Sequence, residues 1–457
     1  MSQSKTGSKV GFSTLFYFGL PTVAYGYMFC LVTLYYMKYA TDILLISPAI
    51  MGLIFGLSRL WDAVSDPLVG YWSDRTKFWL GRRRSWIGMS ALPTALTFLM
   101  IFVPPQGLGE NELVVWVGVG IIGFFSASTF FYVPQMALGA ELTDDHHERN
   151  KVFGVRHAGW IGGYIIGIGA MAALISAEQT GIAAVQETSR QLAYIVAPLG
   201  GLSLIICAYG IREREEFASK GSKRPFKAIR DVFRNPHARP PLIGYFFDNI
   251  GFAFTSILML YVGTYILEAP EAAPKFLLTF LIPSFLLTPV WMPLARRVGK
   301  KAVWSFSMYL SALCYGLMFT LGKGDETLLM AIGFFAGIAN GAGHVIGPSL
   351  MSDTIDYDEL QTGERKEGAY FAAWNFTWKL ANGISLIVVG NMLSFVGFQP
   401  NVAQAPAVIL AIKIMFSIVP CIAYVMAALV FSSYRLDEKL HLEMHAILDE
   451  NRTKPAQ

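Results

Sequence analysis

The sequence predicts an all-α polytopic membrane protein with twelve transmembrane helices in two pseudo-symmetric six-helix bundles. The 457 residues are 54% hydrophobic and only 15% charged, whereas soluble domains carry about 25% charged residues. Apolar windows of about 20 residues, long enough to cross a bilayer, recur along the chain. The longest charged stretch, residues 211–241, separates six of these windows from the next six.

The expected helices follow these windows in chain order. They lie near residues 13–40, 47–72, 85–104, 112–139, 153–175, 191–211, 241–267, 275–295, 301–322, 328–352, 368–394 and 406–433. Only the segment EAPEAAP separates the seventh window from the eighth. The first window is long and further spans follow it, so we expect a retained helix rather than a cleaved signal.

Basic residues predict which loops face the cytoplasm. Alternate loops contain Arg75, Lys77, Arg82–Arg84, Arg149, Lys151, Arg156, Arg212–Arg239, Arg296, Arg297, Lys300, Lys301, Arg365 and Lys366, and the opposite loops contain little beyond Arg190, Lys275 and Lys323. The positive-inside rule places the basic loops and both termini on the cytoplasmic side. The expected domains are an N-terminal bundle at 1–211, a cytoplasmic middle loop at 212–240, a C-terminal bundle at 241–433 and a cytoplasmic tail at 434–457.

Charged loops at matched positions indicate an internal duplication. GYWSDRTKFWLGRRR follows the second window and PLARRVGKK the eighth, while AELTDDHHERNKVFG follows the fourth and SDTIDYDELQTGERKEGAY the tenth. Cytoplasmic loops are often charged for other reasons, but two matched pairs favour duplication. Repeats of this kind are typical of secondary transporters.

The second window contains acids where acids are energetically expensive. Asp62 and Asp66 are four residues apart and share one helix face with Arg59. An ionised Asp near the middle of a bilayer costs about 2.5–3.5 kcal/mol on insertion scales. Two converging carboxylates are hard oxygen ligands for a small cation, or a pair that shares a proton. The alternative is a buried structural ion pair.

Other polar residues also lie inside apolar windows. Lys379 lies in the middle of the eleventh window, where it would neutralise the acids or hold an anionic group of a substrate, whereas Lys38 lies near a helix end and is expected to reach water. Asp248 either lines a cavity or caps a neighbouring helix. His344 either handles protons or packs through a hydrogen bond.

Several function classes lack support in the sequence. We find no phosphate-binding loop, nucleophile triad or metal-ligand cluster, so we expect neither an enzyme nor an ATP-driven pump, no cofactor and no nucleic-acid partner. The four cysteines lie in apolar segments without metal or redox spacing.

The loop GYWSDRT…GRRR, together with twelve spans, resembles the major facilitator superfamily. That superfamily has a Gly-x-x-x-Asp-Arg…Gly-Arg-Arg pattern between helices 2 and 3. The matching residues here are Gly70, Asp74, Arg75, Gly81, Arg82 and Arg83, with a longer insert than usual. The resemblance implies the major facilitator fold, with alternating access to a solute site between the two bundles.

Three longer segments narrow the resemblance. SRLWDAVSDPLVG, VPQMALGAELTDDHHER and SDTIDYDELQTGERKEGAYFAAWNFTWKLA are similar to the glycoside–pentoside–hexuronide:cation symporters, the group of the melibiose permease. This resemblance implies a transporter that couples a Na+ or H+ gradient to the movement of a sugar-like solute. It also implies a bacterial inner-membrane protein that contacts membrane lipid and functions as a monomer.

The resemblance assigns roles to individual residues. Asp62 and Asp66 match the carboxylates that bind the coupling cation, and Thr129 falls where the family has a hydroxyl at that site. Arg59 and Lys379 match its charge partners, and Arg156 falls where the permease has a sugar-site arginine. The expected substrate-binding residues are Tyr25, Gly26, Tyr132, Gln135, Arg156, Asp248, Trp374, Asn375 and Trp378. The expected cytoplasmic gate consists of Asp74, Arg75, Arg82, Arg83, Glu148 and Arg149, with Arg84 and Glu141.

One departure from the family affects the expected solute. Gly26, beside Tyr25, and Tyr132 stand where the melibiose permease has the acids that bind sugar hydroxyls. This favours a hexuronide, a less polar glycoside or an amphiphile over a galactoside. A cation-coupled carrier of an amphiphile such as a lysophospholipid is therefore an alternative function, because the vertebrate lysophospholipid symporter belongs to the same wider group. A solute sensor without transport is another alternative.

Overall fold

We analysed a computed structural model of the chain, which describes residues 10–143, 145–213, 232–362 and 367–434. The chain divides into two compact units, Met1–Lys223 and Arg224–Gln457. The division falls inside the predicted middle loop. Most of that loop and nearly all of the predicted tail lie outside the described residues.

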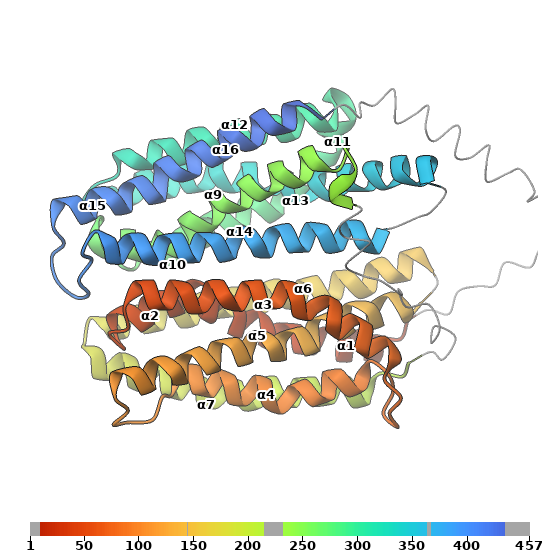
Figure 1. Cartoon of the computed structure of the whole chain (residues 1–457), viewed down its shortest axis with the longest axis horizontal. Coiled ribbons are helices and arrows are strands. Elements are labelled where there is room, and N and C mark those ends of the chain that lie inside the picture. Colours follow the sequence, from red (N-terminus) through yellow and green to blue (C-terminus); the bar gives the residue numbers. More distant parts are fainter. Residues whose placement is uncertain (1–9, 144, 214–231, 363–366, 435–457) are drawn as a thin grey trace, which may run out of the picture. The chain divides into compact units, whose positions relative to one another are not determined.

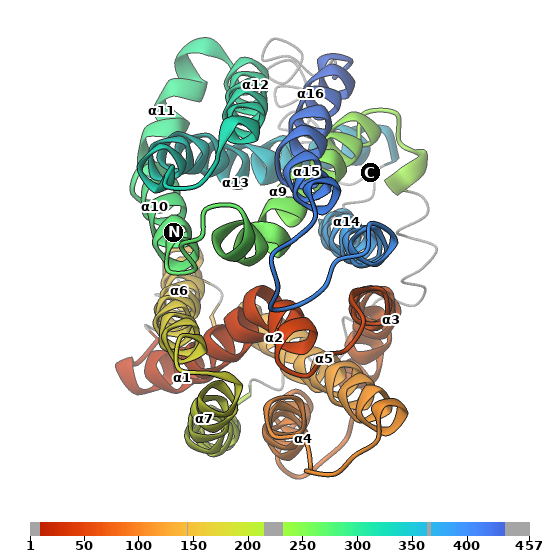
Figure 2. The same cartoon turned by 90° about the vertical axis from the view of Figure 1, so that its left-hand side faces the viewer.

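The first unit is a bundle of long helices that run side by side (Figures 1 and 2). Its elements are α1 (Phe12–Cys30), the π-helical turn η1 (Leu31–Tyr35), α2 (Tyr36–Asp42), α3 (Pro48–Arg75), α4 (Arg84–Phe102), α5 (Glu110–Glu141), α6 (His146–Glu178) and α7 (Ile182–Gly210). The first predicted span thus comprises α1, η1 and α2. The predicted site residues of this unit lie on α1, α3, α5 and α6.

The second unit repeats this pattern of helices. Its elements are α9 (Arg239–Tyr265), α10 (Ala272–Leu286), α11 (Thr288–Val298), α12 (Lys300–Leu317), η3 (Met318–Thr320), α13 (Glu326–Thr362), α14 (Glu367–Phe395), α15 (Pro406–Lys413), η4 (Ile414–Ile418) and α16 (Val419–Ser432). The eighth predicted span is bent by 52° between α10 and α11. Pro289 starts α11 and has no backbone N–H to continue the helix of α10.

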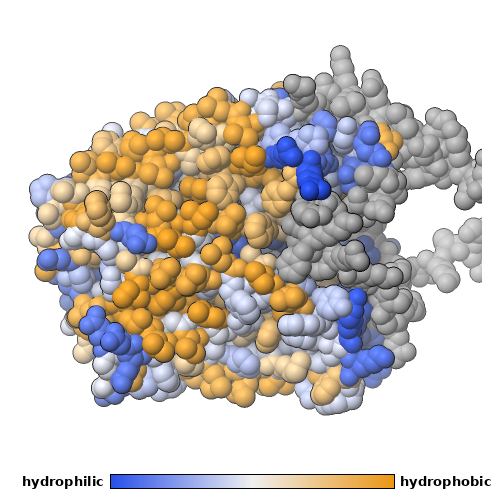
Figure 3. Space-filling view, viewed as in Figure 1, coloured by the Kyte–Doolittle hydropathy of each residue, from blue (hydrophilic) through white to orange (hydrophobic). Residues whose placement is uncertain are grey.

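The composition of the helices supports the predicted membrane spans. Within the described residues, nine helices are long and apolar enough to cross a membrane, or ten if α10 and α11 form one span. α3 and α14 have 28 and 29 residues but contain the charged residues of interest, which lower their hydropathy. The predicted count of twelve requires both as spans and stays a prediction. On the visible faces, apolar side chains lie between hydrophilic helix ends (Figure 3).

Glycines allow the closest helix contacts within each unit. A Cβ on Gly163 of α6 would overlap the backbone carbonyl of Val23 on α1, and one on Gly337 of α13 would overlap that of Phe280 on α10. Small residues commonly allow such close backbone approach between membrane helices. These contacts fix the positions of α1 and α6, two of the helices that carry the candidate site of the first unit.

Candidate functional site

The predicted cation-site residues of the first unit come together between α3 and α5. The Thr129 hydroxyl on α5 donates a hydrogen bond of 2.9 Å to Oδ1 of Asp66 on α3. One turn earlier on α3, Nη1 of Arg59 lies 3.5 Å from Oδ2 of Asp62. Arg59, Asp62 and Thr129 are each at most 5% exposed. The helix therefore places the buried Asp62 beside a cationic side chain and the half-buried Asp66 beside a hydroxyl.

Aromatic rings enclose the Arg59 guanidinium. Its Cζ lies 3.9 Å from the centre of the Phe125 ring on α5 and 5.4 Å from that of Phe29 on α1. Both distances are within the range of cation–π attraction. The sequence reasoning did not identify either phenylalanine, because nothing in the local pattern of α5 distinguishes a ring beside Arg59 from ordinary core packing.

The chemistry of this group suits a small monovalent cation. Two carboxylates and one guanidinium leave more negative than positive charge among the three side chains, and burial makes that imbalance costly. Carboxylate and hydroxyl oxygens are hard ligands, and the same carboxylates can instead take up a proton. The chemistry of these side chains is therefore compatible with a small monovalent cation or a proton.

Three predicted substrate residues form a second group in the first unit. Arg156 of α6 donates from Nε to Oε1 of Gln135 at 3.1 Å, and its guanidinium lies 4.7 Å from the Tyr132 ring centre. Gln135 is fully buried and also donates from Nε2 to the carbonyl of Phe18 on α1. Gln135 thus connects three helices and orients Arg156, a geometry that favours a positioning role over direct solute contact.

Tyr25 and Gly26 of α1 pack against the neighbouring helices α5 and α6. The Tyr25 ring lies 5.3 Å from the ring centres of Phe131 and Trp160. A Cβ on Gly26 would overlap the backbone carbonyl of Trp160 on α6. This close approach explains the glycine without a solute, so we leave Gly26 out of the proposed site.

The predicted residues of the second unit lie on α9 and α14. Trp374 is 6% exposed and stacks on Tyr245, with ring centres 3.7 Å apart. Asp248 is half-buried and lies near the Tyr424 hydroxyl of α16. Both side chains are therefore held by neighbours inside this unit.

The remaining predicted residues of this unit are more accessible. Asn375 is exposed on α14, and Trp378 and Lys379 on the same helix are half-buried. His344 on α13 is exposed. Their roles in substrate and charge contacts stay predictions.

A charged network joins the loop between α3 and α4 to the end of α5. Arg83 lies 2.5 Å from Asp74 and 3.1 Å from Glu141, and Arg82 lies 2.8 Å from Glu141. The Glu213 carboxylate, just after α7, accepts the backbone N–H groups of residues 82, 83 and 84 at 2.7–2.9 Å. Negative charge is favourable at this helix N-terminus because its first N–H groups have no partner within the helix.

The second unit has a counterpart of this network. Lys300 at the start of α12 pairs with Asp353 of α13 at 2.7 Å, as Arg82 and Arg83 pair with Glu141. Lys301 donates to the carbonyls of Ser432, the last residue of α16, and of Tyr434 just after it, as Arg84 donates to that of Ala208 near the end of α7. These matched contacts support the duplication that the charged loops predicted.

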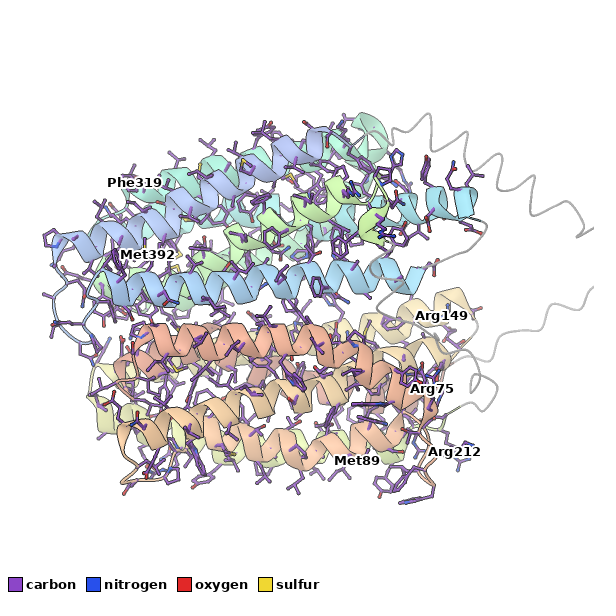
Figure 4. The ribbon with its side chains drawn as sticks, viewed as in Figure 1. Arg75, Met89, Arg149, Arg212, Phe319 and Met392 are labelled. Atoms are coloured by element: carbon purple, nitrogen blue, oxygen red, sulfur yellow. The ribbon has the colours of Figure 1, made fainter. Side chains whose placement is uncertain are left out.

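The other predicted gate residues lie near the same end of the first unit, which we call the basic end. Figure 4 labels Arg75, Arg149 and Arg212 there. Glu148 pairs with Lys151 at 2.5 Å. Arg75 stacks on Tyr71, 3.6 Å from the ring centre, and Arg149 donates to the carbonyl of Thr143. These contacts therefore lie within one unit, and a gating role stays a prediction.

At the opposite end of this unit, Lys38 differs from its expected position. It is 2% exposed and pairs with Asp42 at 3.2 Å and with Glu178 of α6 at 2.7 Å. The expectation that Lys38 reaches water is wrong. The Tyr35 hydroxyl also donates to Glu178, so the lysine has two carboxylate partners within the bundle in place of solvent.

Comparisons with known proteins agree with this architecture. The family model described as MFS/sugar transport protein matches residues 17–438. The chain is 27% identical to the uncharacterized symporter YnaJ of Bacillus subtilis, over 93% of this chain and 92% of YnaJ. It is 23% identical to the sodium-dependent lysophosphatidylcholine symporter 1 of Xenopus tropicalis, over 96% of this chain and 90% of that protein.

A solved structure extends the comparison to the fold. The crystal structure of the D-xylose-proton symporter superposes with a TM-score of 0.64 at 15% identity, covering 93% of this chain and 97% of that one. At this level of identity the likeness shows the fold alone. Because the family model covers nearly the whole sequence, this chain belongs to the MFS/sugar transport protein family of the major facilitator superfamily.

Proposed function

We propose that this chain moves a solute across the membrane against its gradient by coupling it to Na+ or H+, which bind at Asp62, Asp66 and Thr129. Family membership makes the chain a multi-pass cation-coupled transporter rather than an enzyme. The observation that carries the site assignment is the hydrogen bond between Thr129 and Asp66 beside the pair of Arg59 and Asp62. These two contacts lie one turn apart on α3, which supports a shared site for the two carboxylates and the Thr129 hydroxyl.

In this proposal the coupling ion changes the charge of the site. Without the ion, Asp62 and Asp66 repel each other and depend on cationic neighbours. A bound cation removes this imbalance, and the occupied state then binds solute more tightly. Coupling is reciprocal, so bound solute also raises the affinity for the ion. Lys379 of α14 is the proposed charge partner from the second unit.

A sugar-like solute is the favoured cargo. Arg156 presents guanidinium donors above the Tyr132 ring, and an aromatic face with adjacent donors suits a sugar ring or a uronate carboxylate. Trp374, Trp378, Asn375 and Asp248 are the proposed contributors from the second unit. We further propose an inner-membrane location, cytoplasmic termini and a monomeric carrier that also contacts lipid.

An amphiphile is the second candidate cargo. Two observations favour it: the similarity to a protein named as a lysophosphatidylcholine symporter, and the presence of Gly26 and Tyr132 where the melibiose permease has acids. Alkyl chains pack well against aromatic side chains.

The experiment that tests the function is uptake into proteoliposomes. Labelled glycosides, hexuronides and lysophospholipids are supplied with or without an inward Na+ or H+ gradient, using the wild-type protein and D62N. Gradient-driven uptake that D62N abolishes supports the proposal and names the solute class. Solute binding without accumulation under any gradient would instead identify a sensor.

A further inference from the structure

The Arg59 guanidinium lies between a carboxylate and an aromatic ring. Its Nη1 is 3.5 Å from Oδ2 of Asp62, whereas charge-assisted N–H···O bonds are about 2.7–2.9 Å long. Its Cζ is only 3.9 Å from the centre of the Phe125 ring, well within the ≈ 6 Å limit for cation–π attraction. The ion pair is therefore stretched, while the stacking contact is close.

The Phe125 ring is itself fixed in place. It is 1% exposed and has edge contacts with Phe29 of α1, Phe55 of α3 and Phe124 of α5 at ring distances of 5.6–6.5 Å. A ring held from three sides cannot readily turn away from Arg59. The guanidinium therefore packs against a rigidly held aromatic ring beside Asp62.

A guanidinium that closed on Asp62 would compete with the coupling ion. Arg and carboxylate form strong, often bidentate pairs when nothing separates them. In such a pair the Arg59 guanidinium, which is part of the protein and does not dissociate, would occupy the carboxylate oxygens. A ring that holds the Arg59 guanidinium 3.5 Å from Asp62 keeps its positive charge near the site without a close ion pair.

We propose that Phe125 is a positioning residue whose ring holds the Arg59 guanidinium off Asp62 and so keeps the Asp62 carboxylate available to a monovalent cation. This inference rests on the proposed function of Asp62. It assigns ion affinity, rather than solute recognition, to an aromatic residue on α5.

The test compares F125L, which removes the π face, with F125Y, which keeps it. Equilibrium binding of radioactive sodium is measured on the purified full chain. F125L is expected to raise the Na+ dissociation constant up to about 30-fold, the factor equivalent to a desolvated cation–π contact of about 2 kcal/mol. F125Y is expected to stay within about threefold of wild type.

The matched control is F98L. Phe98 of α4 is 1% exposed, and its ring contacts are with Phe102 and Phe124 rather than with Phe125 or a guanidinium. Size-exclusion profiles and melting temperatures of all variants show whether a loss of packing explains a change. In an R59Q background, F125L is expected to have no further effect on sodium binding, which a double-mutant cycle measures.

The outcomes distinguish a failure of the proposed role of Phe125 from a failure of the proposed cation site at Asp62. If sodium binding depends on Asp62 but F125L and F98L behave alike, the role of Phe125 is refuted and the cation site stands. If R59Q binds no sodium, the comparison of F125L with F125Y alone tests the role of the Phe125 ring. If the wild type binds no sodium, Asp62-dependent proton uptake is measured as the difference between wild type and D62N. A change in this uptake in F125L that F125Y and F98L do not share supports the role of Phe125, and equal behaviour refutes it. Binding of either ion without dependence on Asp62 would refute both proposals.

Discussion

The substitution T129V tests the cation site through one oxygen atom. Valine keeps the shape of the buried threonine and removes the hydroxyl that lies 2.9 Å from Oδ1 of Asp66. A hydrogen bond to a charged group contributes about 1.5–3 kcal/mol. If the same oxygen binds Na+, its loss weakens sodium affinity by about 10- to 150-fold. The ion-free site also loses its hydrogen bond to Asp66, which offsets part of this effect, so we expect a value near the lower end.

The effect of T129V depends on the coupling ion. For Na+, T129V removes a ligand, so the sodium concentration for half-maximal uptake rises about tenfold. For H+, sodium does not drive uptake, so T129V leaves the response to sodium as in the wild type. One variant therefore distinguishes the two ions.

The assay is the initial rate of solute uptake into proteoliposomes at varied external sodium and pH. The control is T97V on α4, because the Thr97 hydroxyl donates to carbonyls of its own helix, Pro93 at 2.7 Å and Thr94 at 3.3 Å. T97V should leave both ion dependences unchanged. Wild-type sodium and pH dependence in T129V would exclude Thr129 from the site.

Three further predictions concern stability, measured as melting temperature of the purified protein. G163A should destabilise by about 1–3 kcal/mol through overpacking against α1, while G162A should not, because a Cβ there has no neighbour within 4 Å; equal effects would contradict the packing account. E213Q should lose about 1 kcal/mol of charge stabilisation at the N-terminus of α4, and an unchanged melting temperature would mean that this contact is not stabilising. K38M leaves the buried Asp42 and the half-buried Glu178 without their cation and should destabilise by about 3 kcal/mol, the lower end for a broken buried pair, whereas K323M, in an exposed pair with Glu268, should cost less than about 1 kcal/mol; a smaller loss for K38M than for K323M would refute this.

The fold class could be predicted because it depends on patterns that survive without tertiary contacts. Hydropathy windows and matched charged loops indicated the spans and the repeat, and the family model confirmed the family. Helix ends were less predictable. α13 continues to Thr362, about ten residues beyond its apolar window, because a helix can continue after the chain leaves the apolar layer.

The candidate site could be predicted only where all of the residues concerned lie on one helix. The spacing of Asp62 and Asp66 is visible in the sequence, but the ring beside Arg59 comes from another helix. Lys38 shows the same limit, because its partner Glu178 lies 140 residues further along the chain. The expectation that Lys38 reaches water followed from its position near a helix end and could not include that partner.

Gln135 illustrates a related limit. Its type suggested a hydrogen-bonding ligand for solute, yet its amide donates to the carbonyl of Phe18 and accepts from Arg156. Side-chain type predicts the capacity for hydrogen bonds but not which groups use it. The contacts of Gln135 depend on how α1, α5 and α6 meet, which local sequence does not specify.

The central claim is that Asp62 couples solute movement to a cation gradient, and one comparison tests it most directly. Solute accumulation driven by a Na+ or H+ gradient and solute exchange at equilibrium are measured in the same proteoliposomes, for wild type and D62N. The account predicts that D62N loses accumulation while it retains exchange, because the carrier still moves solute but no longer binds the driving ion. Accumulation by D62N equal to that of the wild type would contradict the account.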